Sequence, residues 1–219
     1  MTIRLADTKL FQGFQEEQIQ SLLACLEART QIYPKGAVIM AEGSVTRSLG
    51  LVLSGRAIIS RVDVWGNSSI LGHVDPGVVF GEVYACIPGQ PLLVSVTADE
   101  QTRVLLLDVE RVMTTCARAC DFHARLIGNL LQVCALRSLE LSRRIGHTSA
   151  KTIRGRLLSY FSQCAKEAGG SAFRIPYDRQ QLADYLGVDR SALSNELSKM
   201  KREGLIDCEK NRVQLKVEG

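Results

Sequence analysis

The chain has 219 residues and carries 27 Lys and Arg against 23 Asp and Glu, a net charge of +4. This length allows one large domain or two modest ones, each with its own core. No segment approaches the ~20 apolar residues of a membrane span, and the first residues lack the apolar core of a secretory signal. The seven cysteines are scattered without a CxxC pair, which is typical of reduced thiols. We therefore expect a cytoplasmic protein with no membrane partner.

The first half of the chain predicts short helices followed by a barrel. Between residues 7 and 28, apolar residues recur at helical spacing. From Gln31 to Asp108, short aliphatic and β-branched stretches alternate with Gly, Pro and Asn turn residues. Strands at this spacing indicate a closed antiparallel barrel or a jelly roll, which we assign to residues 1–107.

Residues 108–146 predict a long helix with two apolar faces. One face contains Leu126, Leu130, Val133 and Leu136. The other is a heptad seam, the α-helical repeat of coiled coils, formed by Ile127, Leu131, Cys134, Ser138, Leu141 and Ile145. Such a helix needs two partners, here its own barrel and the twin helix of a second subunit. A core helix in a monomer is the alternative.

Residues 147–219 predict a second, basic domain. It holds 13 Lys and Arg against 9 Asp and Glu, whereas residues 1–150 hold 14 of each. Gly146 to Ser149 predict a helix break and an interdomain hinge, followed by a helix from Ala150 to about Ala168 that ends at Gly169. A charge excess confined to this domain favours a polyanionic partner.

Residues 178–204, DRQQLADYLGVDRSALSNELSKMKREG, predict a helix-turn-helix. Asp178 with Gln181 forms a capping-box pattern for the first helix, and Gly187 lies at the turn. Asp189 caps a second helix whose apolar stripe is Leu193, Leu197 and Met200. A two-stranded wing turned at Lys210-Asn211 follows. A hairpin that only packs within the protein is the alternative.

The other face of this second helix carries the candidate DNA contacts. A helix in the major groove presents its first turns to base edges, where Arg can bind guanine and Asn adenine. The candidates for base contact are Arg190, Ser191, Ser194 and Asn195. The candidates for phosphate contact are Arg179, Gln180 and Lys199.

The order of these parts resembles the Crp/Fnr family of transcription regulators. The resemblance rests on LVLSGRA, on PGVVFGE and on the segment VDRSALSNELSKMKREGLI. It implies an α+β fold with an N-terminal double-stranded β-helix (jelly-roll) barrel of the cyclic-nucleotide-binding type, a dimerisation helix and a C-terminal winged helix-turn-helix. It also implies a homodimer on double-stranded DNA with a palindromic operator, and RNA polymerase as a partner.

The effector implied by the resemblance does not carry over evenly. Glu82 falls where cyclic-nucleotide binders place a carboxylate on the ribose, but Leu92 and Leu93 replace the phosphate-binding Arg-Ser pair. No Lys or Arg lies between Val83 and Thr102, and a buried phosphate needs a cation. We therefore expect an unidentified effector rather than cyclic AMP. The candidate contacts are Glu82, Leu92, Leu93 and, from the dimerisation helix, Ser138.

Two alternatives to this interpretation remain. One is a redox- or metal-responsive regulator that acts through Cys and His residues, and the other is a module that binds a protein partner. Cys116, Cys120 and His123 would share one helix face and could bind a metal, but packing is the commoner role, so no metal site is predicted. Cys86 could be a redox-active thiol, with a buried structural thiol favoured. His73 and His147 are expected to be solvated in turns. The last alternative is a protein-interaction module with a vestigial barrel. No P-loop, GxSxG or HExxH motif suggests an enzyme.

Overall fold

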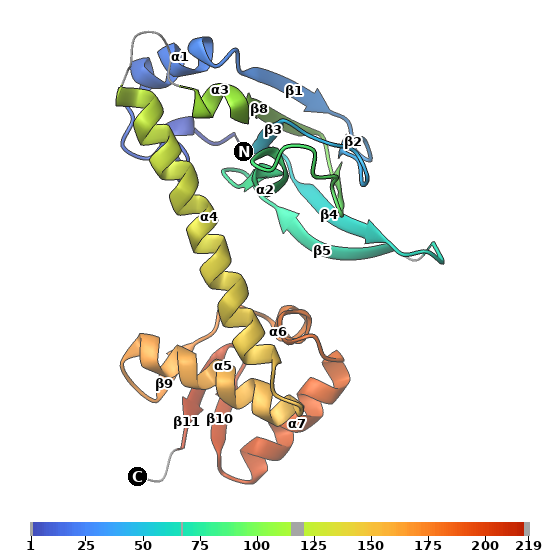
Figure 1. Ribbon diagram of the computed structural model, residues 1–219. Helices are drawn as coiled ribbons and strands as arrows, with labels where there is room; N and C mark the ends of the chain where they lie inside the picture. The colour runs from blue at the N-terminus through green and yellow to red at the C-terminus, as the bar shows by residue number, and fades with distance from the viewer. Residues whose placement is uncertain (1, 67, 115–120, 217–219) are drawn as a thin grey trace. The chain divides into compact units, whose positions relative to one another are not determined.

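The computed structural model describes residues 2–66, 68–114 and 121–216 (Figure 1). The chain divides into two compact units, Met1–Leu136 and Arg137–Gly219, and the division falls within one long helix, α4 (Asp121–Thr148). Each unit is described by itself. None of the described helices combines the length and the apolar character needed to cross a membrane.

In the described residues, the first unit is a jelly roll of eight strands. Its strands are β1 (Arg29–Tyr33), β2 (Val38–Met40), β3 (Ser48–Ser54), β4 (Ala57–Val62), β5 (Ser68–Val74), β6 (Val79–Phe80), β7 (Ser95–Ala98) and β8 (Thr102–Asp108). They form two antiparallel sheets of order β1-β8-β3-β6 and β2-β7-β4-β5. This arrangement confirms the predicted barrel.

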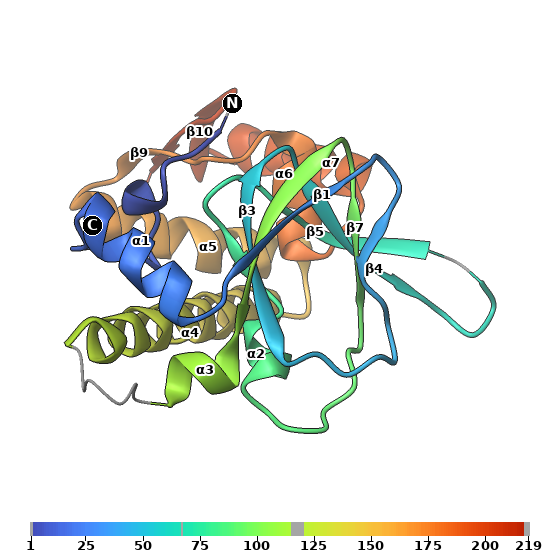
Figure 2. The ribbon, with the colours of Figure 1, turned by 90° about the horizontal axis from the view of Figure 1, so that it is seen from above.

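Short helices accompany the barrel. They are η1 (Leu5–Asp7), α1 (Glu16–Cys25), α2 (Glu82–Ala85) and α3 (Val109–Met113). Figure 2 shows α1 and the start of α4 on one side of β3 and β8, with the second sheet on the other side. The first sheet is therefore covered on both faces.

Strand β3 shows how the sequence encodes this double cover. Leu49, Leu51 and Leu53 belong to the core that includes α1 and α4, whereas Val52 belongs to the core between the sheets. Gly50 has no room for a side chain, because a Cβ there would lie 2.2 Å from the ring of Phe80. A strand buried on both faces reads as a continuous apolar run, as LGLVL does here.

The start of α4 is held against the barrel unit. Leu126, Leu130 and Val133 are buried in the same core as α1 and β3. Arg125 donates a hydrogen bond to the carbonyl of Gly13, and Asn129 donates to the carbonyl of Leu10. The expectation that one apolar face of the long helix packs on its own barrel is confirmed for these three residues, whereas Leu136 of the same expected face is 43% exposed.

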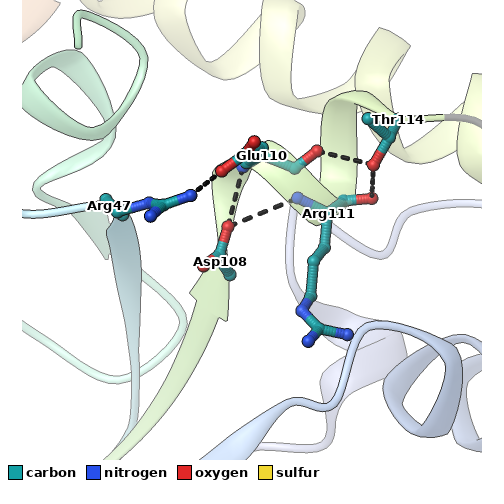
Figure 3. A network of polar contacts seen from close by, with 5 residues as sticks. All are labelled: Arg47, Asp108, Glu110, Arg111 and Thr114. Atoms are coloured by element: carbon teal, nitrogen blue, oxygen red, sulfur yellow. Dashed lines mark hydrogen bonds and ion pairs between the residues drawn. The ribbon is translucent and has the colours of Figure 1, made fainter.

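A polar network fixes the exit from β8 into α3 (Figure 3). The Asp108 carboxylate accepts hydrogen bonds from the backbone N–H groups of Glu110 and Arg111, at 2.9 and 3.3 Å. Glu110 pairs with Arg47, and Thr114 donates to the Glu110 carbonyl. Exposed ion pairs of this kind contribute little stability, so their main effect is on geometry. The single helix expected from residue 108 is interrupted, because α3 ends at Met113 and the next residue, Thr114, has an extended backbone.

The second unit holds the C-terminal part of α4 and the predicted helix-turn-helix. Its further elements are α5 (Ile153–Ala168), β9 (Ala172–Arg174), α6 (Arg179–Leu186), α7 (Arg190–Arg202), β10 (Ile206–Glu209) and β11 (Arg212–Leu215). Strands β10 and β11 form the expected wing, with its turn at Lys210 and Asn211. A third strand, β9, pairs with β11 and was not predicted.

The expected helix break at Gly146 is wrong. Helix α4 continues through Gly146 to Thr148, because a single glycine in an exposed helix costs only about 1 kcal/mol relative to alanine. The next helix begins at Ile153 rather than Ala150. Its N-cap is Thr152, whose side chain accepts a hydrogen bond from the N–H of Gly155 at 3.0 Å.

Candidate nucleic-acid interface and effector site

The geometry of the helix-turn-helix is set by local polar contacts, as predicted. Asp178 accepts a hydrogen bond from the N–H of Gln181 at 2.8 Å, and the Gln181 side chain accepts one from the N–H of Asp178 at 2.9 Å. Gly187 ends α6 with φ 63°, in the left-handed region that favours glycine. Asp189 caps α7 by accepting from the N–H of Ala192 at 2.9 Å. These contacts fix both helix starts and the turn between them.

The predicted division of α7 into two faces is confirmed. Leu193, Leu197 and Met200 are at most 3% exposed and pack in the core of the second unit. The opposite face is accessible: Arg190, Ser191, Asn195, Ser198 and Lys199 are exposed, and Ser194 is half-buried. The candidate base contacts therefore lie on the face of α7 opposite its buried stripe; α7 itself is labelled in Figure 1.

The serine hydroxyls on this face already donate hydrogen bonds. Ser191 donates to the carboxylate of Asp189, and Ser194 donates to the carbonyl of Arg190 at 2.9 Å. By contrast, the side chains of Arg190 and Asn195 form no hydrogen bond or ion pair with another residue in the described part of the chain. Arg190 and Asn195 are thus the side chains ready to donate to a ligand.

Arg154 of α5 forms two ion pairs with acidic residues of α7 and its C-terminal cap. Its guanidinium pairs with Glu203 at 2.7 Å and with Glu196 at 2.6 Å. Hydrogen bonds to Glu203 and then to Glu196 raise the pKa of Arg154. The carboxylate of Glu196 on α7 is therefore occupied by an arginine of α5. This contact could not be predicted from sequence patterns, because residues 154 and 196 lie far apart in the chain.

The three candidate phosphate contacts lie in different surroundings. Lys199 and Gln180 are exposed, and Gln180 donates to the carboxylate of Asp184 at 2.9 Å. Arg179 is half-buried, and one of its guanidinium nitrogens lies 2.7 Å from the sulfur of Cys208. Arg179 thus connects α6 to the wing strand β10, a contact that sequence reasoning missed.

His147 is buried, which corrects the expectation that it is solvated in a turn. It lies in the last turn of α4 and is 7% exposed. Its Nδ1 is 2.9 Å from the hydroxyl of Tyr185, and the ring of Tyr160 packs edge-on against it. Burial lowers the pKa of His147, and the nearby charge of Glu167 opposes this effect while that of Arg143 adds to it. His73, by contrast, is exposed on β5.

The candidate effector residues are not all brought together. Glu82 is fully buried at the start of α2, and Leu92 is 2% exposed in the core between the two sheets. The adjacent Leu93 is 62% exposed. Ser138 is exposed on α4 and belongs to the second unit. Of the four candidate effector residues, only Glu82 and Leu92 are therefore buried in the barrel unit.

Among residues 29–108, the barrel offers a bound phosphate no buried cationic side chain. The Lys and Arg residues between residues 29 and 108 all lie in the described part of the chain, and all are exposed: Arg29, Lys35, Arg47, Arg56, Arg61 and Arg103. A phosphodiester bound among the sheets would lack a charge partner. These residues do not fit the phosphate of a cyclic nucleotide.

The cysteine and histidine candidates give no metal cluster among the residues described. Cys116 and Cys120 lie outside the described residues, and His123 is 2% exposed with its Nε2 3.9 Å from the sulfur of Cys25. Across residues 2–66, 68–114 and 121–216, no group of three His, Cys, Asp or Glu could hold a metal ion. Cys86 is exposed rather than buried, and partial desolvation, followed by the charge of Glu82, raises the pKa of its thiol. A raised pKa keeps the thiol protonated and weakly nucleophilic.

The heptad seam of α4 is largely exposed. Leu131, Leu141 and Ile145 are 69%, 60% and 67% exposed, and Ser138 is also exposed. Ile127 and Cys134 are half-buried. Exposed apolar residues at heptad spacing are typical of a helix that packs against another helix.

Both halves of the chain match known protein families. Residues 30–119 match the cyclic nucleotide-binding domain, and residues 155–218 match the Crp-like helix-turn-helix domain. The chain belongs to the Crp/Fnr family of transcription regulators. It is therefore a DNA-binding regulator, and its relatives are regulators rather than enzymes.

Two curated relatives and one solved structure illustrate the similarity. A CRP-like cAMP-activated global transcriptional regulator of Mycobacterium tuberculosis is 25% identical over 210 residues, which cover 94% of this chain and 91% of that protein. The cyclic AMP receptor protein of Thermus thermophilus is 26% identical over 197 residues, 90% of this chain and 87% of that protein. The c-di-GMP responsive global regulator CLP of Xanthomonas campestris has the same fold, with a TM-score of 0.59 at 19% identity, over 93% of this chain and 100% of that chain.

We predict that acidification destabilises the regulator partly through His147. The pKa of His147 is lower in the folded protein than its usual value of 6.5. The unfolded chain therefore takes up this proton first, and the free energy of unfolding falls as pH drops below about 6.5. His147→Gln cannot titrate, so its melting temperature should fall less between pH 7.5 and 5 than that of the unmodified protein. Melting temperatures are measured by circular dichroism. An equal fall in melting temperature for the two proteins would contradict this prediction.

Proposed function

We propose that the regulator acts as a cytoplasmic homodimer that reads a palindromic DNA operator through α7, under the control of an effector other than cyclic AMP. The observation that carries the proposal is the exposed face of α7, where Arg190 and Asn195 stand opposite the buried stripe of Leu193, Leu197 and Met200. A helix with this division can enter the major groove without exposing apolar surface.

The chemistry of Arg190 and Asn195 supports direct base reading. An arginine can donate two hydrogen bonds to guanine, and an asparagine can form two with adenine. Ser191 and Ser194 already donate to protein atoms, so their hydroxyls are available to a base as acceptors. Lys199 on α7 and Gln180 on α6 are exposed and suited to contact phosphates. Phosphate contacts of this kind fix the position of a protein on the duplex.

Arg190→Ala and Asn195→Ala should each relax the sequence preference at one base pair. We expect each variant to lose about 1–3 kcal/mol of discrimination at that position and to keep the preference elsewhere. Binding to a library of duplexes with single base changes measures this. Lys199→Ala is the matched comparison, because loss of a phosphate contact should weaken binding equally across sequences and lower the slope of log affinity against log salt by about 0.9.

Equal losses on all duplexes for Arg190→Ala and Asn195→Ala would assign these residues to the phosphate backbone. Binding that is independent of salt would favour the other function, a protein-interaction module.

The homodimer is supported by the exposed seam of α4. Leu131, Leu141 and Ile145 would each be removed from water by the seam of a second copy, at about 25 cal/mol per Å2 of apolar surface. A two-fold dimer presents two copies of α7, which suits an operator with half-sites about one helical turn apart. RNA polymerase is the further partner that we propose for a regulator of this family.

Leu131→Glu should convert the dimer to a monomer with little effect on the fold of a single chain. The side chain is 69% exposed, so the charge disturbs no core of the chain itself but meets its counterpart across the seam. Sedimentation equilibrium measures the association. Val64→Glu is the control, because Val64 is 91% exposed on the β4–β5 turn and lies outside the seam. Unchanged association of Leu131→Glu would remove the seam as the interface.

The effector is proposed to bind in the barrel near Glu82 and Leu92 and to shift the packing of the paired α4 helices. A ligand can do this only by binding one arrangement more tightly than the other. The exposed position of every Lys and Arg between residues 29 and 108 supports an effector without a phosphate. The raised pKa of Cys86 weighs against thiol oxidation as the signal.

Calorimetric titration of the regulator with cyclic AMP should therefore give no micromolar binding. A phosphate in the barrel would be desolvated without a cationic partner, which is strongly unfavourable. The Mycobacterium tuberculosis relative, described as cAMP-activated, provides the positive control for the ligand solution. Micromolar binding that disappears in Glu82→Gln would place cyclic AMP in this barrel and overturn this part of the proposal.

A further inference from the structure

We infer that Arg144 is a positioning residue that fixes the direction of the recognition helix relative to α4, and thereby the half-site spacing that the dimer accepts. This inference rests on the proposed homodimer. It concerns contacts within the second unit alone, where the last turns of α4 meet the C-terminal end of α6.

Two arginines occupy the final carbonyl groups of α6. Arg144 of α4 donates from Nε to the carbonyl of Tyr185 and from Nη2 to that of Asp184, both at 2.9 Å. Arg156 of α5 donates from Nη1 to the carbonyl of Leu186 at 2.8 Å. The last carbonyls of a helix have no partner within the helix and form the negative end of its dipole, so a cation there is favourable.

Helix α4 holds the side chain of Tyr185 as well as its backbone. The Arg144 guanidinium lies over the Tyr185 ring, with its central carbon 5.6 Å from the ring centre. One turn further along α4, His147 is hydrogen-bonded to the Tyr185 hydroxyl at 2.9 Å. The hydrogen bonds of Arg144 and His147 are directional, so together they restrict rotation of α6 against α4 as well as its distance.

The position of α6 determines that of α7. The turn between them is short and defined by the left-handed Gly187 and the cap at Asp189. Leu186 and Leu193, on either side of this turn, are fully buried in one core. The recognition helix therefore follows α6, and α6 follows the end of α4.

The continuous end of α4 changes the predicted route from the dimerisation helix to the recognition helix. The segment 146–149 was expected to be a hinge, but α4 is helical through Thr148 and belongs to the DNA-binding unit from Arg137 onward. A change in how two α4 helices pack would then move the two recognition helices as attached bodies. Arg144 is suited to this role because one planar guanidinium can bind two carbonyls and stack on a ring, whereas the ammonium group of lysine cannot.

Half-site spacing tests the inference directly. We would measure the affinity of the full-length protein for a single half-site and for two-half-site operators whose spacer is shortened or lengthened by one or two base pairs. Arg144→Gln should keep single half-site affinity within about twofold, because α7 itself is intact. It should lose roughly tenfold or more on the best-spaced operator and show a flattened spacing profile, because the second half-site no longer meets a pre-positioned helix.

Arg143→Gln is the matched control. Arg143 is an exposed arginine on the same helix whose contact with Glu167 is 3.6 Å long, so its spacing profile should match that of the unmodified protein. Arg144→Lys keeps the charge and should give an intermediate profile, which also serves if Arg144→Gln does not fold.

The outcomes separate this inference from the proposed function. A sharp spacing preference that survives unchanged in both Arg144→Gln and Arg144→Lys overturns the inference and leaves the homodimer standing. If the unmodified protein gains nothing from a second half-site at any spacing, the homodimer proposal fails, and this inference fails with it.

Discussion

Helix α4 carries more apolar surface than one partner can cover. Leu126, Leu130 and Val133 are buried against the sheet and helix α1 of the same chain. Leu131 and Leu141 stay exposed on the other side, and each costs free energy in proportion to its apolar area in water. The two-sided requirement places the barrel contact and the exposed seam on one element, so under the proposed mechanism a change in the barrel core would act on the helix that a second copy contacts.

Apolar packing alone would leave the orientation of α6 against α4 adjustable. Dispersion and the hydrophobic effect have little directional preference, whereas hydrogen bonds to backbone carbonyls depend on angle. The contact between α4 and α6 combines both kinds of interaction. Aromatic rings around Tyr160 and Tyr185 bury apolar surface, and the hydrogen bonds of Arg144 set the orientation of the two helices. Arg154 has a similar role on the inner side of α7, through Glu196 and Glu203.

The parts of the fold that the sequence could predict are those encoded by neighbouring residues. The capping box of Asp178 and Gln181, the turn at Gly187 and the alternation in the barrel strands are local signals, and the structure confirms them. The burial of His147 and the contact of Arg179 with Cys208 depend on residues far along the chain. The break predicted at Gly146 is absent, because the surrounding helix outweighs the low helix propensity of one glycine.

The unpredicted strand β9 has a mechanical consequence. It precedes α6, and its partner β11 follows α7, with Phe173 opposite Val213. Backbone hydrogen bonds therefore tie the entrance of the helix-turn-helix to its exit, and both strands contribute to the same core. A protease that cuts the exposed turn at Gly187 would leave two fragments still joined by this pairing, so the nicked domain would separate only on denaturation.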